Sequence, residues 1–306
     1  MAKVLITGAN GFVGRTLVNH LRNPVTVSRE AEAVIKGQPH FQLSSFEECE
    51  LLDPILGQVD CIVHLAALAH KKAISLEEFM RVNRDGTLRL AGRVKAAGVR
   101  RFIFISSIGV NGVFSDEPFR VTDTPKPLEP YAESKLATEL ALKELFRGST
   151  TELVIIRPPL VYGPTAPGNF GSLIKLVCSK LPVPLGSVRN KRSLIALDNL
   201  VDIIKVCIEH PKAANQTFLV SDEDDVSTTE LLKRMARAFG VTQWLIPVPK
   251  WLLMLLAKFI GKGAAVDRLF GSLQVDITHT KETLGWKPPV TMEEQLRKIA
   301  ESLTNK

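Results

Sequence analysis

The sequence has little of what marks a secreted, metal-binding or membrane-spanning chain. Its four cysteines are scattered over 306 residues without a Cys-x-x-Cys pair, which predicts reduced thiols in a cytoplasmic protein. Its six histidines show no ligand spacing, so we expect no metal site. No signal peptide is expected either, because the apolar run at residues 4–6 is short and ends in a glycine turn.

Blocks of basic residues are also missing, although the formal net charge is +7 and the pI is near 9.2. The lysines and arginines are dispersed without interleaved aromatic residues, which argues against a nucleic-acid partner. A hydrophobic content of 45% and a charged content of 23% predict a globular protein with one large core and a smaller lobe. A diphosphate ligand would need only a few of the positive groups.

A glycine-rich turn near the amino end organises the rest of the chain. Residues 4–6 predict a buried strand, and Gly8, Gly11 and Gly14 lead from it into a helix. Gly8 permits a tight turn, Gly11 lets backbone N–H groups approach a phosphate, and Gly14 lets the helix pack close to the strand. The pattern predicts a dinucleotide-binding turn whose helix faces an anion, with an ordinary strand-to-helix turn as the alternative.

The next strand, at residues 25–27, ends in Ser28 and Arg29. A dinucleotide fold usually has an acidic residue here to hold the adenosine ribose. Arg29 would pair with a 2′-phosphate, and Ser28 would bring no repulsion. This favours NADP over NAD, unless Arg29 is only a solvated loop charge.

Alternating segments predict the fold class. A strand at residues 60–67 ends in the small residues Ala66 and Ala67, a helix follows at 77–97, and another strand lies at 99–105. Small residues at a strand's end leave room for a flat cofactor. The alternation predicts an α/β protein with a Rossmann-like, doubly wound parallel sheet.

Three polar residues form the candidate catalytic set. Ser107 stands at the carboxyl end of the strand at 99–105, where a doubly wound sheet presents reactive groups. Tyr131 and Lys135 are four residues apart on a predicted helix and share one face, although such a pair also occurs on helix surfaces. An ammonium beside a phenol is expected to lower the phenol's pKa from about 10, which would make Tyr131 a usable acid or base.

These motifs occur in the order and approximate spacing of extended short-chain dehydrogenases/reductases. The sequence resembles their NAD(P)-dependent nucleotide-sugar epimerase/dehydratase branch over nearly its whole length. Further segments resemble landmarks of that branch: His64-Leu65-Ala66-Ala67, Asn83 with Gly86-Thr87, Arg157-Pro158 with Tyr162-Gly163-Pro164, and Leu284-Gly285-Trp286-Lys287-Pro288.

The resemblance implies a role for each residue of the set. Tyr131 would exchange a proton with a sugar hydroxyl or carbonyl, Lys135 would hold the nicotinamide ribose and tune Tyr131, and Ser107 would hydrogen-bond the reacting oxygen. Ala66 and Ala67 would lie beside the cofactor. The residues that would line its pyrophosphate are Gly8, Asn10, Gly11, Phe12 and Gly14.

Departures from the family pattern narrow the reaction. Dehydratases of the family carry an Asp-Glu pair directly after the strand-end hydroxyl, where this sequence has Ile108-Gly109, and the cysteine of the family's GDP-fucose synthases is absent. Oxidation, reduction or epimerisation at one carbon, C4, remains. Because Arg29 favours NADPH, the sequence predicts reduction of a UDP-4-keto-6-deoxy-N-acetylhexosamine. The alternatives are a UDP-hexose 4-epimerase of the UDP-glucose or UDP-GlcNAc type with retained NAD, and a non-catalytic NADP-sensing protein.

The resemblance also divides the chain. Residues 1–165 would form the dinucleotide-binding Rossmann domain, and residues 166–306 would form mainly a substrate-binding lobe interleaved with sheet segments. Arg192 resembles the family arginine that clamps the nucleotide diphosphate, and Asn169 and Arg268 fall where related enzymes contact the nucleotide. A homodimer through a four-helix contact that includes the Tyr131 helix is expected from the family.

The most apolar window of the chain lies at residues 250–261. It is too short to span a bilayer, which needs about 20 residues. We interpret it as a helix buried in the substrate lobe. The alternative interpretation places it on a membrane surface or a partner, with Lys250, Lys258 and Lys262 meeting lipid phosphates.

Overall fold

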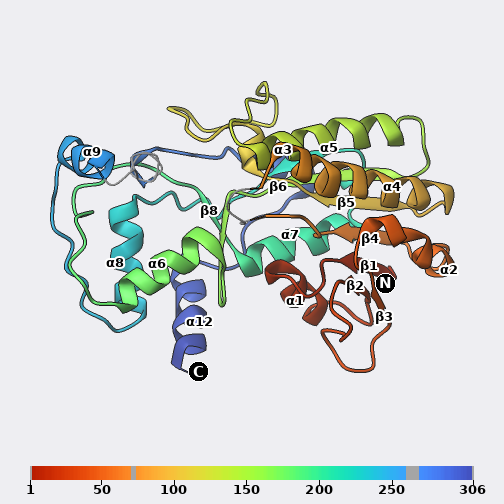
Figure 1. The fold of residues 1–306 in the computed structure, drawn as a ribbon, viewed down its shortest axis with the longest axis horizontal. Helices are drawn as coiled ribbons and strands as arrows, with labels where there is room; N and C mark the ends of the chain where they lie inside the picture. Colours follow the sequence, from red (N-terminus) through yellow and green to blue (C-terminus); the bar gives the residue numbers. More distant parts are fainter. Residues whose placement is uncertain (1, 70–73, 260–268, 305–306) are drawn as a thin grey trace.

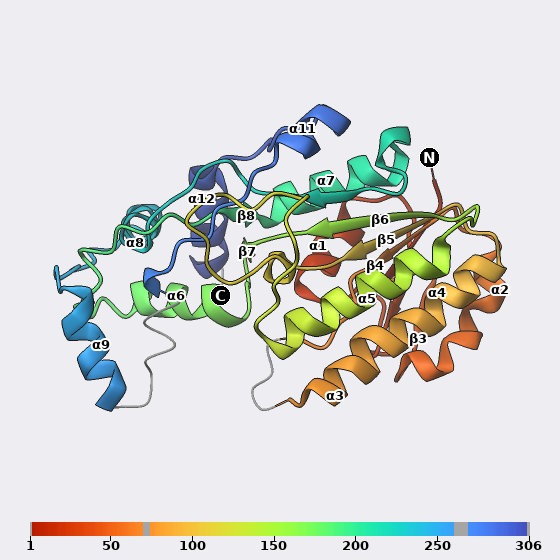
Figure 2. The same cartoon turned by 90° about the horizontal axis from the view of Figure 1, so that it is seen from above.

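The computed structural model describes residues 2–69, 74–259 and 269–304. Seven parallel strands form one sheet in the order β3-β2-β1-β4-β5-β6-β9, and β7 pairs with β8 in a second small sheet (Figures 1 and 2). The strands are β1 (Val4–Thr7), β2 (Val25–Ser28), β3 (His40–Gln42), β4 (Cys61–His64), β5 (Arg101–Ile105), β6 (Glu152–Arg157), β7 (Leu160–Tyr162), β8 (Leu194–Ala196) and β9 (Thr217–Leu219). The Rossmann-like parallel sheet predicted from the sequence is confirmed.

Helices cover both faces of the large sheet, with α4 and α5 on one face and α1 and α7 on the other (Figure 2). The helices are α1 (Phe12–Asn19), α2 (Asp53–Leu56), α3 (Leu76–Phe79), α4 (Gly86–Ala96), α5 (Pro130–Phe146), α6 (Gly168–Cys178), α7 (Leu197–Glu209), α8 (Thr228–Ala238), α9 (Lys250–Phe259), α11 (Thr278–Leu284) and α12 (Met292–Thr304). Shorter helical turns are η1 (Phe46–Leu52), η2 (Met80–Asp85), η3 (Ile108–Val110) and η4 (Pro211–Ala213).

The first strand shows why continuous apolar runs become central strands. Successive side chains of a strand point to opposite faces. Leu5 packs into the core beneath α4 and α5, whereas Val4 and Ile6 pack into the core beneath α1 and α7. Because both faces are covered, successive positions of the run are apolar, and the run loses the alternation of a half-exposed strand.

The order of the strands reverses at β1, so the carboxyl end of β1 lies at the switch point of the sheet. The chain runs from β1 outward to β2 and β3, and then returns to β4 on the other side of β1. Such a switch point is where a doubly wound sheet binds its ligand. The glycine turn that follows β1 and the small residues that follow β4 therefore meet at one place.

Two predicted elements differ in the structure. The predicted strand at 60–67 ends at His64, after which the chain is irregular. The predicted helix at 77–97 is divided into α3, the π-helical turn η2 and α4. The wider turn of η2 contains Asn83, whose amide bonds the backbone of Leu68 in the irregular segment after β4.

A second apolar core lies in the part of the chain after β6. It joins β7 and β8 to α6, α8 and α12, and Figure 1 shows these helices at the end of the molecule away from β3 and α2. Strand β9 and helix α7 nevertheless belong to the large sheet and its cover. The division at residues 165 and 166 stays a prediction.

Helix α9 coincides with the apolar window, but it is not fully buried as expected. Leu253 is buried, whereas Trp251 and Leu255 are exposed. Among the residues described, no helix combines the length and the apolar content that crossing a bilayer requires.

Candidate functional site

The glycine turn is built from close backbone contacts. Gly8 has a φ of +70°, which favours glycine, and a Cβ there would lie 2.7 Å from the backbone nitrogen of Ala66. A Cβ on Gly14 would lie 2.2 Å from the carbonyl oxygen of Gly8. The turn therefore presses α1 onto the end of β1 and sets it against the start of the segment after β4.

This turn fits the phosphates of a dinucleotide. Gly11 caps α1 without a side-chain hydrogen bond, and α1 has no acidic residue in its first turn. The free amides of a helix N-terminus attract an anion. The side-chain oxygen of Asn10 is buried beside the turn with no hydrogen-bond partner, so a polar group is left for a ligand. That Gly8, Asn10, Gly11, Phe12 and Gly14 line the pyrophosphate stays a prediction.

A carboxylate that the sequence analysis missed lies near the proposed ribose position. The hydroxyl of Ser28 is engaged by the backbone of Glu30, and the side chain of Arg29 is exposed. The carboxylate of Glu30 accepts a hydrogen bond from the amide of Asn10 and lies 3.6 Å from the guanidinium of Arg15. The available signal in the sequence was an acidic residue two positions beyond β2. Its contact with Asn10 joins residues 20 positions apart, so the sequence did not reveal that contact.

The residues after β4 are tied to the turn by buried hydrogen bonds. The hydroxyl of Thr7 and the Nδ1 of His64 lie 2.8 Å apart, and the Nε2 of His64 lies 2.9 Å from the hydroxyl of Thr87. Burial lowers the pKa of His64 to about 3, so its ring stays neutral and holds the strand ends in place. Ala66 is half-buried and Ala67 is exposed beside this link.

Lys135 is buried, and its ammonium group lies between the end of β5 and the ring of Tyr131. Its Nζ donates a hydrogen bond of 2.8 Å to the carbonyl of Ile105, at the end of β5, and lies 4.5 Å from the ring centre of Phe104. Burial lowers the pKa of Lys135 to about 7, although the charge of Glu139 opposes the shift. The group is therefore able to hold or release a proton near neutral pH.

Tyr131 lies within 5.8 Å of the Lys135 ammonium, measured to the ring centre, as their spacing predicts. The expected fall in the phenol's pKa is not found in the protein alone, because burial raises the pKa of Tyr131 to about 12. The nearby ammonium is not enough to offset the loss of solvent. An additional positive charge or hydrogen-bond donor at this phenol is needed for it to ionise near neutral pH.

Ser107 is brought next to the start of α5. Its hydroxyl accepts a hydrogen bond of 3.1 Å from the backbone of Gly109. A Cβ on Gly109 would lie 3.3 Å from the Ser107 hydroxyl and 3.2 Å from the Cβ of Ala132, the neighbour of Tyr131. A side chain at position 109 would be crowded, and Ile108 is buried in the core. The two positions that hold acids in dehydratases are therefore unsuited to them here.

Asn83 connects the segment after β4 to helix α5, which carries the catalytic candidate Tyr131. Its side chain bonds both backbone groups of Leu68 and donates to the hydroxyl of Ser134, which in turn donates to the carbonyl of Tyr131. These bonds fix the first turn of α5 against the irregular segment. Asn83 is thus a positioning residue for Tyr131.

A buried ion pair lies one helical turn below Lys135. The carboxylate of Glu139 on α5 receives the guanidinium of Arg157 on β6 in two hydrogen bonds of 2.9 and 2.6 Å, and also the hydroxyl of Ser106. Arg157 and Glu139 are 4% and 1% exposed. Breaking such a pair is costly because one charge stays buried without its partner.

Of the three residues expected to contact the nucleotide from the lobe, the structure describes two. Arg192 lies on a segment paired with Val226 and Leu273, and its guanidinium donates to the carbonyl of Gly271. Its pKa is lowered by burial. Asn169 is exposed in the first turn of α6, and Arg268 lies outside the described residues. The binding of the nucleotide by these three residues therefore stays a prediction.

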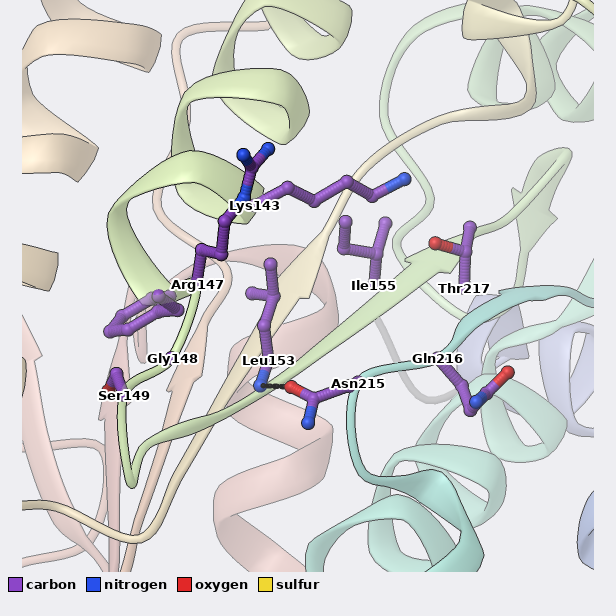
Figure 3. Close-up of a pocket in the computed structure, with 10 residues that line it drawn as sticks. Lys143, Arg147, Gly148, Ser149, Leu153, Ile155, Asn215, Gln216 and Thr217 are labelled. Atoms are coloured by element: carbon purple, nitrogen blue, oxygen red, sulfur yellow. Dashed lines mark hydrogen bonds between the residues drawn. The ribbon is translucent and has the colours of Figure 1, made fainter.

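A surface hollow of about 400 Å³ lies away from the catalytic candidates (Figure 3). Lys143 on the last turn of α5 and Arg147 just after the helix line one side of the hollow, and residues 215–217 line the other side. Tyr131 is at the opposite end of this helix, about 22 Å away at 1.5 Å per residue. The hollow is not part of the candidate site.

Metal chemistry was not expected, and the described residues contain no group of three or more His, Cys, Asp or Glu side chains arranged to hold an ion. The site thus combines a glycine turn that fits phosphates, a phenol, an amine and a hydroxyl. Such groups are suited to binding a dinucleotide and moving a proton at an oxygen.

Comparison with known proteins identifies the family of this chain. The model of the NAD dependent epimerase/dehydratase family matches residues 4–221. A UDP-glucose 4-epimerase of Vibrio cholerae is 45% identical over 98% of this chain and 94% of its own length. The N-acetyl-alpha-D-glucosaminyl-diphospho-ditrans,octacis-undecaprenol 4-epimerase of Escherichia coli O157:H7 is 26% identical over 96% of this chain and 92% of its own.

Solved structures show the same fold. A UDP-glucose 4-epimerase from Thermotoga maritima, determined with UDP-glucose, superposes with a TM-score of 0.76 at 22% identity and covers 99% of both chains. At this identity the likeness concerns the fold. It extends over the lobe as well as over the large sheet.

Proposed function

The chain belongs to the NAD dependent epimerase/dehydratase family, and on that basis we propose that it is a UDP-hexose 4-epimerase that works with retained NAD. The observation that carries the proposal is the site at the carboxyl ends of β1 and β5, where the glycine turn, Ser107, Tyr131 and Lys135 converge. The 45% identity to a protein named UDP-glucose 4-epimerase supports this choice of reaction. Because this relative is named as an epimerase and not as a reductase, the NADPH-dependent reductase is our second candidate.

The first half of the reaction removes hydrogen from C4 of the sugar. Tyr131 takes the proton of the C4 hydroxyl, while the C4–H bond breaks and its electron pair leaves as hydride. NAD held at the glycine turn would supply the acceptor for this hydride and the donor for its return. Ser107 donates a hydrogen bond to the same sugar oxygen, which becomes the carbonyl of a 4-keto sugar.

The second half reverses these transfers on the other face of the sugar. Once the 4-keto sugar has turned over, Tyr131 gives its proton back to the oxygen as C4 regains the hydride that NAD would carry. Lys135 supports the phenol in both directions, because its charged form favours the ionised phenol. Its pKa of about 7 allows both protonation states near neutral pH.

The residues in and beside the glycine turn have distinct tasks in holding the dinucleotide. Gly8, Gly11 and Gly14 admit the pyrophosphate to the backbone of α1, and the unpaired Asn10 oxygen is available to a hydroxyl of the ligand. Glu30, held by Asn10, is suited to ribose hydroxyls and unsuited to a 2′-phosphate. This carboxylate favours NAD.

The second candidate, reduction of a UDP-4-keto-6-deoxy-N-acetylhexosamine by NADPH, is favoured by one observation. Arg29 is exposed directly after β2 and next to Glu30, and a guanidinium pairs well with a 2′-phosphate. Such an enzyme would exchange its cofactor at each turnover. An NADP sensor without turnover would have no need of Ser107, Tyr131 and Lys135 together.

The nucleotide released on denaturation separates the two candidates. Freshly purified protein is unfolded, and the nicotinamide nucleotide set free is identified and counted against the protein. We expect NAD in near-stoichiometric amount, together with interconversion of UDP-galactose and UDP-glucose, or of the N-acetylated pair, without added cofactor. An empty site that prefers NADPH and turns over a 4-keto sugar would refute the epimerase proposal in favour of the reductase.

A further inference from the structure

Large apolar side chains are exposed together at one end of the lobe. They are Leu181, Trp244, Ile246, Trp251 and Leu255, which we call the apolar face. Trp244 and Trp251 are 67% and 68% exposed, so two of the three tryptophans of the chain stand in solvent here. A cluster of this kind marks an interaction surface more often than isolated exposed residues do.

Backbone hydrogen bonds show that two parts of the apolar face lie side by side. Val183 donates to the carbonyl of Trp244 and accepts from the amide of Ile246, so the segment after Leu181 runs along the segment with Trp244. Along that segment the buried Val183 pairs with Leu245, and the residues on either side of Leu245 point outward.

Helix α9 adds the third part. It begins four residues after Ile246, and Trp251 and Leu255 are one helical turn apart on its exposed side. Figures 1 and 2 both place α9 and the chain leading into it at the end of the molecule farthest from α2 and β3. The apolar face is therefore distant from the large sheet.

The sequence around the apolar face is almost free of acidic residues. No Asp or Glu occurs between residues 153 and 197, and only Asp267 occurs between residues 231 and 275. Exposed basic residues in the same ranges are Lys175, Lys180, Arg189, Lys191, Lys233, Arg237 and Lys250. Lys180 directly precedes Leu181, and Lys250 directly precedes Trp251, so positive charge adjoins the apolar residues.

We propose that the apolar face docks the protein on the surface of an anionic phospholipid membrane. Tryptophan side chains favour the boundary between headgroups and acyl chains, and neighbouring lysines favour the negative headgroups. A second copy of the chain is a poorer occupant, because a two-fold contact sets the same face against itself and opposes its positive charges. An anionic surface complements both the charge and the apolar groups.

Vesicle sedimentation tests the proposal. The full chain is mixed with vesicles of phosphatidylcholine alone and with vesicles that also contain phosphatidylglycerol, and the bound fraction is measured with rising NaCl. We expect binding to the anionic vesicles, loss of that binding at high salt, and a blue shift of tryptophan fluorescence on binding. Equal binding to the neutral vesicles, or none to the anionic ones, would overturn the proposal.

Two double variants locate the contact. Trp251→Glu with Leu255→Glu is expected to weaken binding to anionic vesicles at least about tenfold. Leu51→Glu with Leu76→Glu adds the same two charges to exposed positions outside the apolar face and is expected to bind like the native chain. Circular dichroism checks that both variants are folded. Equal weakening by both pairs would show a general charge effect and refute the assignment.

Self-association is measured on the same samples. Sedimentation velocity without vesicles is expected to give the same oligomeric state for the native chain and for Trp251→Glu with Leu255→Glu. A shift to a smaller species in this variant would show that a second copy covers the apolar face, which would also overturn the proposal.

Discussion

At the scale of single residues, Tyr131 and Lys135 show how burial and charge compete. Burial raises the pKa of Tyr131 to about 12 and lowers that of Lys135 to about 7, so each group is driven toward its neutral form. The chemistry proposed for them needs the opposite at the phenol. The protein therefore holds the two groups in place, and a bound ligand has to complete the electrostatics.

The chain contains only two tyrosines, which provides a matched test of the proton transfer. Tyr131→Phe removes one hydroxyl and is expected to lower kcat by about a hundredfold to ten-thousandfold, with the fold and bound NAD retained. Tyr162→Phe removes a buried hydroxyl that donates to Asp222 at 2.7 Å. It is expected to lower stability by about 1–3 kcal/mol and to leave kcat near the native value. Similar kcat values for the two variants would contradict the role of Tyr131.

The lowered pKa of Lys135 predicts a pH dependence of stability. Between about pH 7 and 10 the unfolded chain binds a proton on this amine that the folded, ligand-free chain does not, so the contribution of Lys135 to stability rises with pH. Measured by urea unfolding, the native stability minus that of Lys135→Met should rise by up to about 1.4 kcal/mol per pH unit in this window. A difference that is flat or falls with pH would show that the amine is charged when buried.

Sequence alone predicts some of these residues and misses others. The four-residue spacing of Tyr131 and Lys135 is a local helical relation, so it was predictable. Glu30 was missed because its partner Asn10 is close only after β1 and β2 pair. The raised pKa of Tyr131 was missed because burial is a property of the packed helix.

At the scale of elements, the strand-turn-helix unit at the amino end depends on the absence of side chains. Gly14 has backbone atoms where a Cβ would lie, and backbone atoms move less readily than a flexible side chain. By contrast, a Cβ on Gly92 in α4 would meet nothing within 4 Å. Position 14 therefore requires glycine for steric reasons, whereas position 92 has room for a side chain.

Alanine at each position should give effects of opposite sign. Gly14→Ala is expected to cost about 1–3 kcal/mol in unfolding free energy and to weaken NAD binding at least about tenfold. Gly92→Ala is expected to stabilise the protein by about 0.5–1 kcal/mol, because alanine favours helix. Thermal unfolding and calorimetric titration of NAD report these values. Native-like NAD binding in Gly14→Ala would contradict the assignment of the turn.

The ion pair between α5 and β6 gives a second comparison within one helix. Arg157→Met leaves Glu139 buried without its guanidinium and is expected to cost about 3–5 kcal/mol. Arg147→Met breaks the exposed pair with Glu144 at 2.7 Å and should cost less than about 1 kcal/mol. Chemical denaturation of both variants checks the contrast, and equal losses would show that burial does not decide the value of these pairs.

The sequence predicted where helices and strands lie better than it predicted where a helix is interrupted. The apolar runs and the helical spacing located the core of β1, β4, β5 and α5. The π-helical turn η2 was not predicted. It contains Asn83, which bonds Leu68 in the irregular segment after β4, and this contact between distant segments cannot be seen in a local pattern.

At the scale of the whole molecule, the order of the strands brings distant motifs into one site. The sheet sets the ends of β1, β4 and β5 side by side, and α5 returns across them with Tyr131 at its start. Alternating strands and helices predicted this sheet. The exposed side of α9 was not predicted, since an apolar helix reads alike in a core and on a surface. The homodimer through α5 stays a prediction.

The fate of the hydrogen on C4 tests the central claim most directly. UDP-galactose carrying deuterium at C4 is incubated with the purified protein without added cofactor, and the product is examined by mass spectrometry and proton NMR. We expect UDP-glucose that keeps the deuterium at C4, because the same hydride leaves and returns. No interconversion, or a product with ordinary hydrogen at C4, would contradict it.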